Sequence, residues 1–442
     1  MRQILKKTIL KRDSSIIHLL LFLCFLYSSS GFSQQIVNTL DKDGAWCWFS
    51  DPRAILVDSI LITGWVNSKG SIIAAKLNTD TKKISKYELY HKLEKDDHNN
   101  PVFAVNKDGE VIALYTKHSK KHLYQNLLNS INGPFQFGKT RRLYPFSKKD
   151  LYKYRKPTIT YANPILLNNI LFNFGRYTGF KPNLMWSDDF GTTWTKSSIF
   201  LTRTPYNKSN RPYIKYSSDG NSKIHMVFTD GHPLEEKENS VYYTYFKGGA
   251  FFNAKDQQIA DLSNIPFEPF KTTSIYKFNK EEGRAWIADI SQDSLSNPVI
   301  LYTKSPAKNN HRYWYSRIVN GKWINKEICK SGKWFPKTKK GKKEKEPYYF
   351  GGMTIHPSNP NIIYISKQVN GVFEIERWET KDFGLSWTSS AITKNSKYDN
   401  VRPYIPRGLK KSKEEIVLWM QNKRYRHFTK FKSSIKYSIL KN

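Results

Sequence analysis

The chain has 442 residues, 15% aromatic residues and a formal net charge of +35 at pH 7. This length suits two average domains or one large β architecture. Only three cysteines are present, which excludes a disulfide-rich scaffold. The surplus positive charge indicates an anionic partner or surface, although general lysine usage would also account for part of it.

Residues 1–33 have the order of a secretory signal peptide. Basic residues precede an apolar run, Ile16–Leu26, and small residues follow it. The run is short for a transmembrane helix, and no second long apolar stretch follows. Cys24 comes after a leucine rather than a small residue, which argues against a lipoprotein anchor. We therefore expect an exported protein, secreted or periplasmic, that starts near Gln34 and has no membrane span.

Short apolar or alternating runs recur along the rest of the chain. Gly and Pro turns separate them about every 8–12 residues, and long stripes of helical period are hard to find. This pattern predicts a propeller or a large sandwich of antiparallel hairpins. The runs are Ile60–Val66, Ser71–Leu77, Val102–Val105, Val111–Thr116, Pro157–Tyr161, Ile170–Arg176, Tyr213–Tyr216, Ile224–Thr229, Val241–Phe246, Pro298–Thr303, Arg312–Ile318, Ile362–Ser366, Phe373–Trp378 and Ile416–Met420.

The first hairpin with candidate site residues spans Asp96 to His118. Its two strands are predicted at Val102–Val105 and Val111–Thr116, with a turn between them. Opposed residues in an antiparallel pair have a constant sum of residue numbers, here about 215–217. His98 and His118 sum to 216, so their Cβ atoms are expected roughly 5 Å apart. The alternative is a pair of polar edge residues.

A second hairpin repeats this geometry. Thr158–Leu167 turns at Asn168-Asn169 into Ile170–Tyr177, and opposed residues should sum to about 337. Tyr161 and Arg176 meet this condition. The alternative is that Tyr161 is an ordinary aromatic residue of a strand and Arg176 a salt-bridged surface residue of a strand.

An eight-residue pattern, S/T-x-D-x-G-x-x-W, occurs twice, at 187–194 and 380–387. It is known as the Asp box or BNR repeat. The Asp side chain caps backbone amides, the Gly takes a strained position and the Trp packs beneath the turn. The repeat favours a propeller, but it says little about function because its role is structural.

Further candidates come from later segments. Arg211 and Tyr213 begin one predicted strand, and His232 follows the strand that returns from it. His and Cys are the usual zinc ligands, so His232, His311 and Cys329 form a candidate metal set, although no close spacing joins them.

Six segments of this sequence resemble the BNR-4 propeller group. This group contains ulvan lyases of polysaccharide lyase families 24 and 25, a rhamnose–glucuronate lyase and an α-L-rhamnosidase family. The resemblance covers nearly the whole mature chain and implies a single-domain, seven-bladed β-propeller over residues 34–442. The segments are GAWCWFSDPR at 44–53, DDHNNP at 96–101, YANP at 161–164, RPY at 211–213, FTDGHP at 228–233 and RPYIPR at 402–407.

The resemblance also implies site residues and a cofactor. It implies a structural zinc, for which the metal set above provides candidates, and no organic cofactor. The implied partner is an anionic polysaccharide of the ulvan type. We expect a monomer that cleaves it internally, although the sequence leaves endo and exo action open. The implied catalytic residues are His98, His118, Tyr161, Arg176 and Tyr213, and the substrate-binding candidates are Asn99, Asn163 and Arg211.

These residue types suit a lyase. Such an enzyme removes the C5 proton of a uronic acid and expels the sugar linked at O4. Arg176 can neutralise the uronate carboxylate bidentately, with a histidine as co-donor. The adjacent cation should lower the pKa of Tyr161 and favour it as the base. His98 is the competing base, with Tyr161 then the acid, and the sequence leaves both open.

Two other functions compete with the lyase. A glycosidase normally needs two carboxylic acids on either side of the bond. Asp96 and Asp97 are adjacent and would point opposite ways in an extended chain. A non-catalytic glycan-binding propeller is the other alternative. Nucleic acid is disfavoured because its binding motifs are absent, and the lysine-rich stretch at 336–346 is expected to be a solvated loop.

Overall fold

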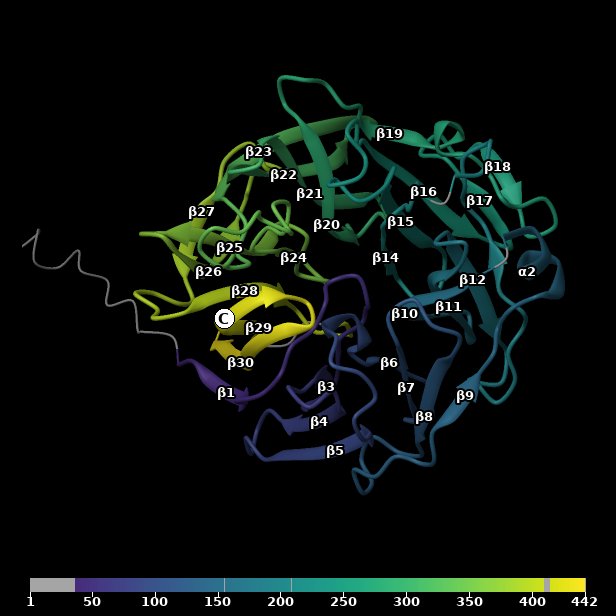
Figure 1. Ribbon diagram of the computed structural model, residues 1–442, viewed down its shortest axis with the longest axis horizontal. Helices are drawn as coiled ribbons and strands as arrows, with labels where there is room; N and C mark the ends of the chain where they lie inside the picture. The colour runs from purple at the N-terminus through teal and green to yellow at the C-terminus, as the bar shows by residue number, and fades with distance from the viewer. Residues whose placement is uncertain (1–35, 155, 208, 409–413, 442) are drawn as a thin grey trace, which may run out of the picture. The chain divides into compact units, whose positions relative to one another are not determined.

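The structure is a computed structural model that describes residues 36–154, 156–207, 209–408 and 414–441. The predicted signal peptide lies outside the described residues. Val37–Asn442 forms one compact unit. Seven antiparallel sheets form a ring within it, which confirms the seven-bladed β-propeller (Figure 1). Within the described part of the chain, no helix is both long and apolar enough to cross a membrane.

The blades follow one another in chain order, and the first strand of each of the first six blades faces the axis of the ring. The first blade contains β2 (Ala54–Val57), β3 (Ile60–Val66), β4 (Ile72–Asn78) and β5 (Ile84–Tyr90). The second contains β6 (Val102–Val105), β7 (Val111–Thr116), β8 (Leu123–Leu128) and β9 (Arg141–Leu143). The third contains β10 (Pro157–Leu167), β11 (Ile170–Thr178), β12 (Pro182–Ser187) and β13 (Ser198–Ile199).

The fourth blade contains β14 (Ile214–Ser218), β15 (Ile224–Thr229), β16 (Val241–Lys247), β17 (Ala250–Phe252), β18 (Gln258–Asp261) and β19 (Thr273–Tyr276). The fifth contains β20 (Arg284–Gln292), β21 (Pro298–Ala307), β22 (Asn310–Val319) and β23 (Lys322–Gly332). The sixth contains β24 (Met353–Ile355), β25 (Ile362–Val369), β26 (Val372–Glu379) and β27 (Thr388–Ala391). The described helices are short: η1 (Asp97–Asn99), α2 (Lys148–Tyr154) and η2 (Pro269–Lys271).

The seventh blade closes the ring with strands from both ends of the chain. Its order is β1 (Asn38–Asp41), β30 (Lys430–Lys441), β29 (Glu414–His427) and β28 (Asp399–Tyr404). The pairing of Asn38 with Tyr437 thus joins the first described strand to the last. Closure by backbone hydrogen bonds fixes the seventh blade against the first, and it brings the tip of the β29–β30 hairpin to the second blade.

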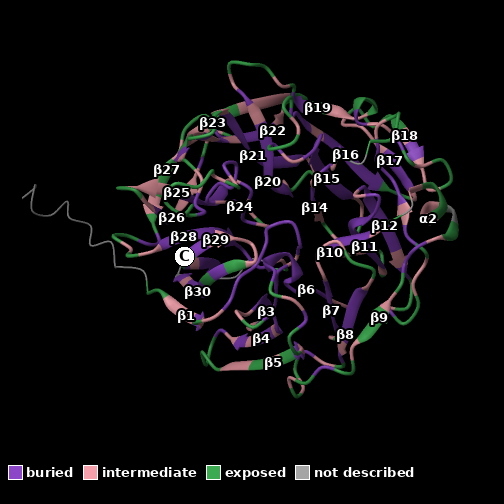
Figure 2. Cartoon of the chain, in the orientation of Figure 1, coloured by how far each residue is buried: buried purple, intermediate pink, exposed green. Residues whose placement is uncertain are grey.

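The inner and middle strands are buried and the outer strands are partly exposed (Figure 2). Every residue of β7 and β15 is buried, whereas β9 has exposed positions. Both faces of a middle strand contact a neighbouring blade, so the near-continuous apolar runs of the sequence match strands covered on both sides.

Both Asp boxes form the predicted turn, between the third and fourth strands of their blades. Asp189 Oδ1 accepts a hydrogen bond from Thr193 N at 2.8 Å, and Asp382 Oδ1 accepts one from Ser386 N at the same distance. The glycine of each box has φ near +90°, a conformation that side chains with a Cβ rarely adopt. The repeats are therefore structural devices of the third and sixth blades.

Two of the segments that carry the resemblance supply buried ion pairs near the axis. Asp51 pairs with Arg53 at 2.9 Å and with Lys215 of β14. Arg407 pairs with Asp289 of β20 at 2.8 Å. A buried charge without a partner is strongly destabilising, so these pairs fix the inner ends of non-adjacent blades against each other.

Candidate active site

The histidine pair lies where the hairpin register predicted it. Val102 of β6 pairs with Leu114 of β7, which is the predicted sum of 216. His98 lies in η1, before β6, and His118 follows β7. Their imidazole rings are stacked, with centroids 4.2 Å apart and planes 24° apart.

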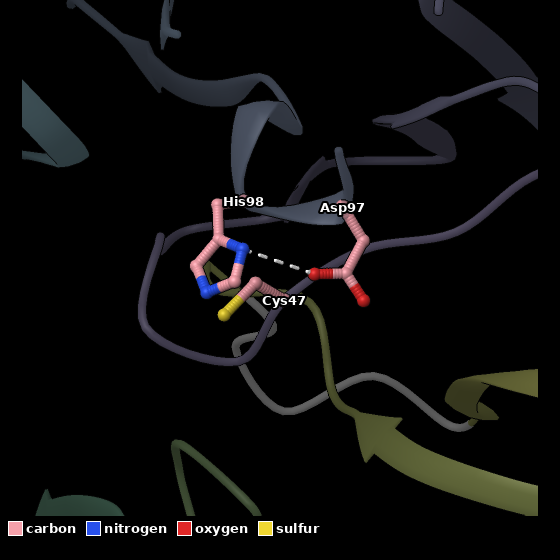
Figure 3. Close-up of side chains that lie close together, drawn as sticks. All are labelled: Cys47, Asp97 and His98. Atoms are coloured by element: carbon pink, nitrogen blue, oxygen red, sulfur yellow. Dashed lines mark ion pairs between the residues drawn. The ribbon is translucent and has the colours of Figure 1, made fainter. Parts of the chain in front are cut away.

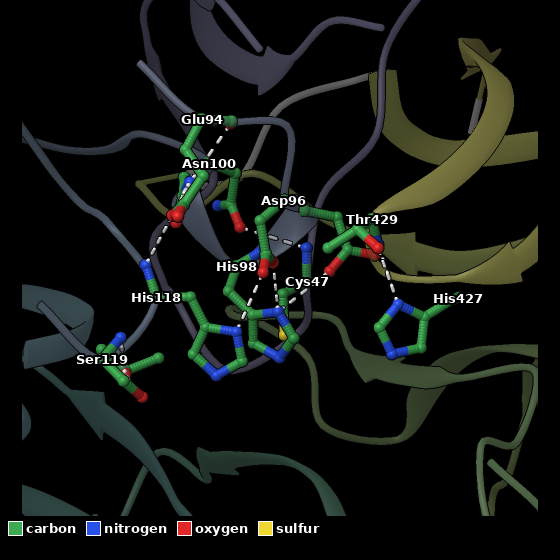
Figure 4. A network of polar contacts seen from close by, with 12 residues as sticks. Cys47, Glu94, Asp96, His98, Asn100, His118, Ser119, His427 and Thr429 are labelled. Atoms are coloured by element: carbon green, nitrogen blue, oxygen red, sulfur yellow. Dashed lines mark hydrogen bonds and ion pairs between the residues drawn. The ribbon is translucent and has the colours of Figure 1, made fainter. Parts of the chain in front are cut away.

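Asp96 binds both imidazoles. Its Oδ1 accepts from His98 Nδ1 at 2.6 Å and its Oδ2 accepts from His118 Nδ1 at 2.9 Å (Figure 4). In a neutral imidazole whose Nδ1 donates to this carboxylate, Nε2 is the unprotonated acceptor. Burial opposes ionisation of Asp96, but the two imidazoles, His98 foremost, hold its pKa below the ordinary range. Burial, then the neighbouring His98, lowers the pKa of His118.

The second hairpin departs from the predicted register at one point. Residues from Asn163 to Leu167 pair with the predicted sum of 337, but Arg176 pairs with Thr160 rather than Tyr161. The direct opposition of Tyr161 and Arg176 was therefore wrong. A bulge at Tyr161 inserts an extra residue, and Tyr161 has φ +68°, rare for a bulky side chain. Such strain is concentrated at functional sites.

Arg176 nevertheless contacts the Tyr161 ring. Its guanidinium carbon lies 5.1 Å from the Tyr161 centroid and 5.2 Å from the Tyr213 centroid. The Nε and Nη1 atoms are buried and have no hydrogen-bond partner within the described residues. A buried donor without a partner is costly, so these atoms are available to an incoming anion.

The two hairpins bring the histidine pair, Tyr161 and Arg176 to one place. The ring of His98 lies 5.6 Å from that of Tyr161, and the Tyr161 ring lies 6.1 Å from that of Tyr213. Imidazoles, phenols and a guanidinium thus converge across three consecutive blades. His118, whose side chain is 24% exposed, is the more accessible of the two histidines, since His98 is 7% exposed.

Arg176 lowers the pKa of Tyr161 as expected, but the expected net lowering was wrong. Burial raises the pKa of Tyr161 well above its ordinary value, the neighbouring Tyr213 adds to this, and the lowering by Arg176 is smaller. The phenol is therefore protonated at neutral pH in the free protein and can donate a proton but not accept one.

His232 lies beside these groups rather than in a metal site. Its ring is 5.6 Å from Tyr213 and 4.5 Å from Trp286. His232 Nδ1 accepts from Leu234 N at 3.1 Å, so its Nε2 carries the proton. Burial, followed by the charge of Arg176, lowers its pKa to about 3 and keeps it a neutral donor.

The three predicted substrate-binding residues differ in their surroundings. Asn163 is occupied by backbone: its Oδ1 accepts from Asp51 N at 3.0 Å and its Nδ2 donates to Phe49 O at 3.3 Å. Asn99 Nδ2 donates to Glu94 Oε2 at 3.1 Å. Both asparagines are buried and shape the site. Arg211 lies at the rim, with its guanidinium 4.1 Å from the Phe180 ring.

The predicted metal ligands do not come together. Among the described residues, the ligating groups that cluster within 4.8 Å are Cys47–Asp97–His98 and Asp96–His98–His118, and neither contains His232, His311 or Cys329. His232 packs on Trp286, and His311 Nε2 donates to Pro347 O at 3.0 Å. This ligand set therefore does not fit a structural zinc, which stays a prediction without assigned ligands.

In the Cys47–Asp97–His98 cluster, the carboxylate of Asp97 is already paired with a cation. Figure 3 shows the Cys47 thiol beside the Asp97–His98 pair. Arg402 Nη1 binds Asp97 Oδ2 at 2.7 Å, so a guanidinium already neutralises this carboxylate. Burial raises the pKa of the Cys47 thiol to about 12, and Cys47 and Cys329 are both free thiols.

Comparison with known proteins agrees with this architecture. A family model described as BNR repeat-containing family member matches residues 62–331, more than half of the chain. The chain belongs to the BNR repeat-containing family. A search of curated proteins finds no match.

Solved structures similar to this member of the BNR repeat-containing family include polysaccharide lyases. One is a PL25 ulvan lyase bound to -[GlcA(1-4)Rha3S]-, with a TM-score of 0.67 and 14% identity over 91% of this chain and 95% of that one. Another is polysaccharide lyase Uly1, with a TM-score of 0.56 and 10% identity over 93% of this chain and 98% of that one. At these identities, the likeness shows a shared fold.

Several contributors to the site in this BNR repeat-containing family member come from the far end of the chain. Phe428, at the tip of the β29–β30 hairpin, has its ring centroid 4.7 Å from His98 and 5.2 Å from His118. Its carbonyl accepts from Asp97 N at 3.0 Å. Tyr425 donates to Asp97 Oδ2 at 2.5 Å. No local pattern in the sequence identifies these contacts, because they depend on ring closure.

The lysine-rich stretch is also tied to this region. Lys337 N donates to Tyr425 O at 2.7 Å, and most of the residues from 337 to 345 are exposed, as expected of a solvated loop. At its end, burial raises the pKa of Glu346 to about 7, and His98 and Asp97 are close enough to influence it. The loop therefore lies beside the histidine pair.

Proposed function

We propose that the protein is a polysaccharide lyase that cleaves a sulfated, uronate-containing polysaccharide of the ulvan type by β-elimination. The observation that carries this proposal is the convergence of the Asp96-bound histidines, Tyr161 and Arg176, and two buried nitrogen atoms of Arg176 have no hydrogen-bond partner among the described residues. The shared fold with ulvan lyases supports it.

Arg176 binds the carboxylate of the uronate in this scheme. Neutralising the carboxylate makes the adjacent C5 proton acidic enough to remove, and a buried guanidinium does this without losing its charge. His232 Nε2–H is the co-donor, since burial keeps that ring neutral. Tyr213, packed between Arg176 and His232, positions the sugar.

The elimination then needs one base and one acid. His98 Nε2 removes the C5 proton, the C5–H electrons form the C4–C5 double bond, and the C4–O4 bond breaks. Tyr161 gives its phenolic proton to the departing O4, and the proton on His98 later returns to Tyr161 through solvent or His118. The raised pKa of Tyr161 favours this assignment over a tyrosine base.

A glycoside hydrolase on the same propeller, such as an α-L-rhamnosidase, is less well supported. Asp96 holds the two histidines and Asp97 is paired with Arg402 and Tyr425, so neither carboxylate is available as the second acid of a hydrolase. Glu346 is the other carboxyl group near His98. The paired histidines would have no role in such a mechanism.

The direct test is incubation of the purified protein with ulvan. A lyase produces an unsaturated uronate with ultraviolet absorbance. A hydrolase yields reducing ends without that absorbance, and a binding propeller yields neither, so either of those results would overturn the proposal.

The pH profile should separate the two candidate bases. With a histidine base, kcat/KM should be flat from about pH 7 to 9 and fall on the acid side, where protonation of His118, whose pKa is lowered below about 6.5, contributes to the fall. A phenolate base would instead give a rate that keeps rising above about pH 9, as the pKa of Tyr161 is raised. Steady-state kinetics across this range decide the matter.

Asp96→Asn should lower kcat by a factor on the order of 10²–10⁴, the range expected for a misoriented general base. The amide accepts from only one imidazole and donates to the other, which reverses the tautomer of that ring. Loss of the carboxylate should also move the acid limb to lower pH, since Asp96 raises the pKa of His118. Asp189→Asn in the Asp box is the matched control, and an unshifted acid limb in Asp96→Asn would contradict the assignment.

A further inference from the structure

A depression lies at the outer edge of the third and fourth blades. It is a groove of about 340 Å³ between α2, the segment after β13 and the segment before β19. Figure 1 shows α2 at the rim of the ring, next to β11 and β12. Its lining residues include Lys153, Tyr154, Arg203, Tyr206, Glu268 and Lys271.

The charge of this groove is positive. Three of its lining residues are basic and one, Glu268, is acidic. Lys153 and Lys271 are exposed on α2 and η2. Arg203 is paired with the buried Asp230, which holds the guanidinium in place while 43% of the side chain stays exposed. One paired guanidinium and two exposed ammonium groups in the same groove suit a carboxylate or sulfate group.

Aromatic rings form the other part of the groove. Tyr154 and Tyr206 lie 4.8 Å apart, and the Tyr206 hydroxyl donates to Gly179 O at 2.9 Å, which fixes its ring. Tyr152 and Phe270, on the two helical segments that flank the groove, are 88% and 73% exposed. Exposed aromatic rings of this kind mark a contact surface for a ligand with apolar faces, such as a sugar ring.

The groove begins where the catalytic hairpin ends. Gly179, which holds Tyr206, is three residues after Arg176. Phe180 contacts both Arg176, at 5.9 Å, and Arg211, at 4.1 Å, measured from guanidinium carbon to ring centroid. Phe180 therefore links Arg176 to Arg211, and Gly179 O links the same hairpin to Tyr206 of the groove.

We propose that this groove is a second glycan-binding subsite, which holds an anionic sugar of the same polysaccharide chain several residues from the cleaved bond. The inference rests on the proposed function for the identity of the chain. The charge and the aromatic pair suit an acidic sugar, and the short stretch from Arg176 to Gly179 places the groove close enough along the hairpin for one polymer to occupy both places. Short oligosaccharides would not reach it.

The test is the double variant Lys153→Ala/Lys271→Ala, because both residues are exposed and their removal leaves the packing intact. On polymeric ulvan, we expect KM to rise about 3- to 10-fold, the range for two exposed charge contacts, with kcat unchanged. On the shortest oligosaccharide that is cleaved, both constants should stay at wild-type values. Lys322→Ala/Lys326→Ala on β23 removes the same charge elsewhere and should leave KM unchanged.

Affinity electrophoresis separates this inference from the proposed function, because it requires no catalysis. In a Tyr161→Phe background, the Lys153/Lys271 variant should be retarded less than its parent in gels that contain ulvan. If retardation decreases only in gels with sulfated ulvan, sulfate is the ligand group. If it decreases equally in gels with desulfated ulvan, the carboxylate is the ligand group. Unchanged retardation in ulvan gels, or an equal loss in neutral dextran gels, overturns the subsite even if the protein is a lyase.

Discussion

Tyr161→Phe should lower kcat on ulvan by a factor on the order of 10²–10⁴, the usual contribution of a general acid, while KM changes little. The substitution removes only the phenolic oxygen. The ring keeps its contacts with His98 and Arg176, and the leaving O4 then departs without a proton. Initial rates of ultraviolet absorbance measure the loss, and thermal unfolding should stay near that of the wild-type protein.

Tyr216→Phe is the matched control for this experiment. Tyr216 is another buried tyrosine of the neighbouring blade, stacked on Phe174 at 4.7 Å, and it has no place in the proposed chemistry. Its variant should retain nearly full turnover. If Tyr161→Phe also retains most of its activity, Tyr161 is not the acid.

Arg176→Lys should reduce kcat by a factor on the order of 10²–10³, similar to the loss of one donor to a developing anion. Lysine keeps the positive charge but not the planar fork that binds a carboxylate through two nitrogen atoms. Arg176→Ala should be at least as inactive, but it also leaves space between the rings of Tyr161 and Tyr213, so some loss of stability is expected there. The lysine variant therefore isolates the chemical effect.

Arg211→Lys provides the comparison for Arg176. Arg211 stacks on Phe180 at the rim, so its replacement should raise KM more than it lowers kcat. Equal losses in kcat for Arg176→Lys and Arg211→Lys would mean that Arg176 does not contact the reacting carboxylate. A wild-type kcat for Arg176→Lys would contradict its role outright.

Local pairing explains why so much of the site was predictable. The register of a hairpin depends on its turn and on the alternation of a few residues, so the opposition of His98 and His118 followed from residue numbers alone. The same rule placed Asn163–Leu167 correctly in the second hairpin. It failed at Tyr161, because a bulge shifts the register by one residue and no local signal in the sequence announces it.

The protonation state of Tyr161 required the complete environment. The adjacency of Arg176 suggested a lowered pKa, but the burial of Tyr161 outweighs that charge and raises the pKa. The rings of Phe49, His98 and Tyr213, from three other parts of the chain, pack around Tyr161. In the same way, the separation of His232, His311 and Cys329 depends on which blade each one joins.

By itself, the sequence determined the antiparallel hairpins, the two Asp boxes and the histidine pair, because each depends on contacts between residues that are close along the chain. Only the tertiary structure decided the contacts of Phe428 and Arg402 with the site, since closure of the ring brings residues more than 300 positions away against η1. It also decided which groups hold protons, because the burial that sets the pKa values arises from blades distant in sequence.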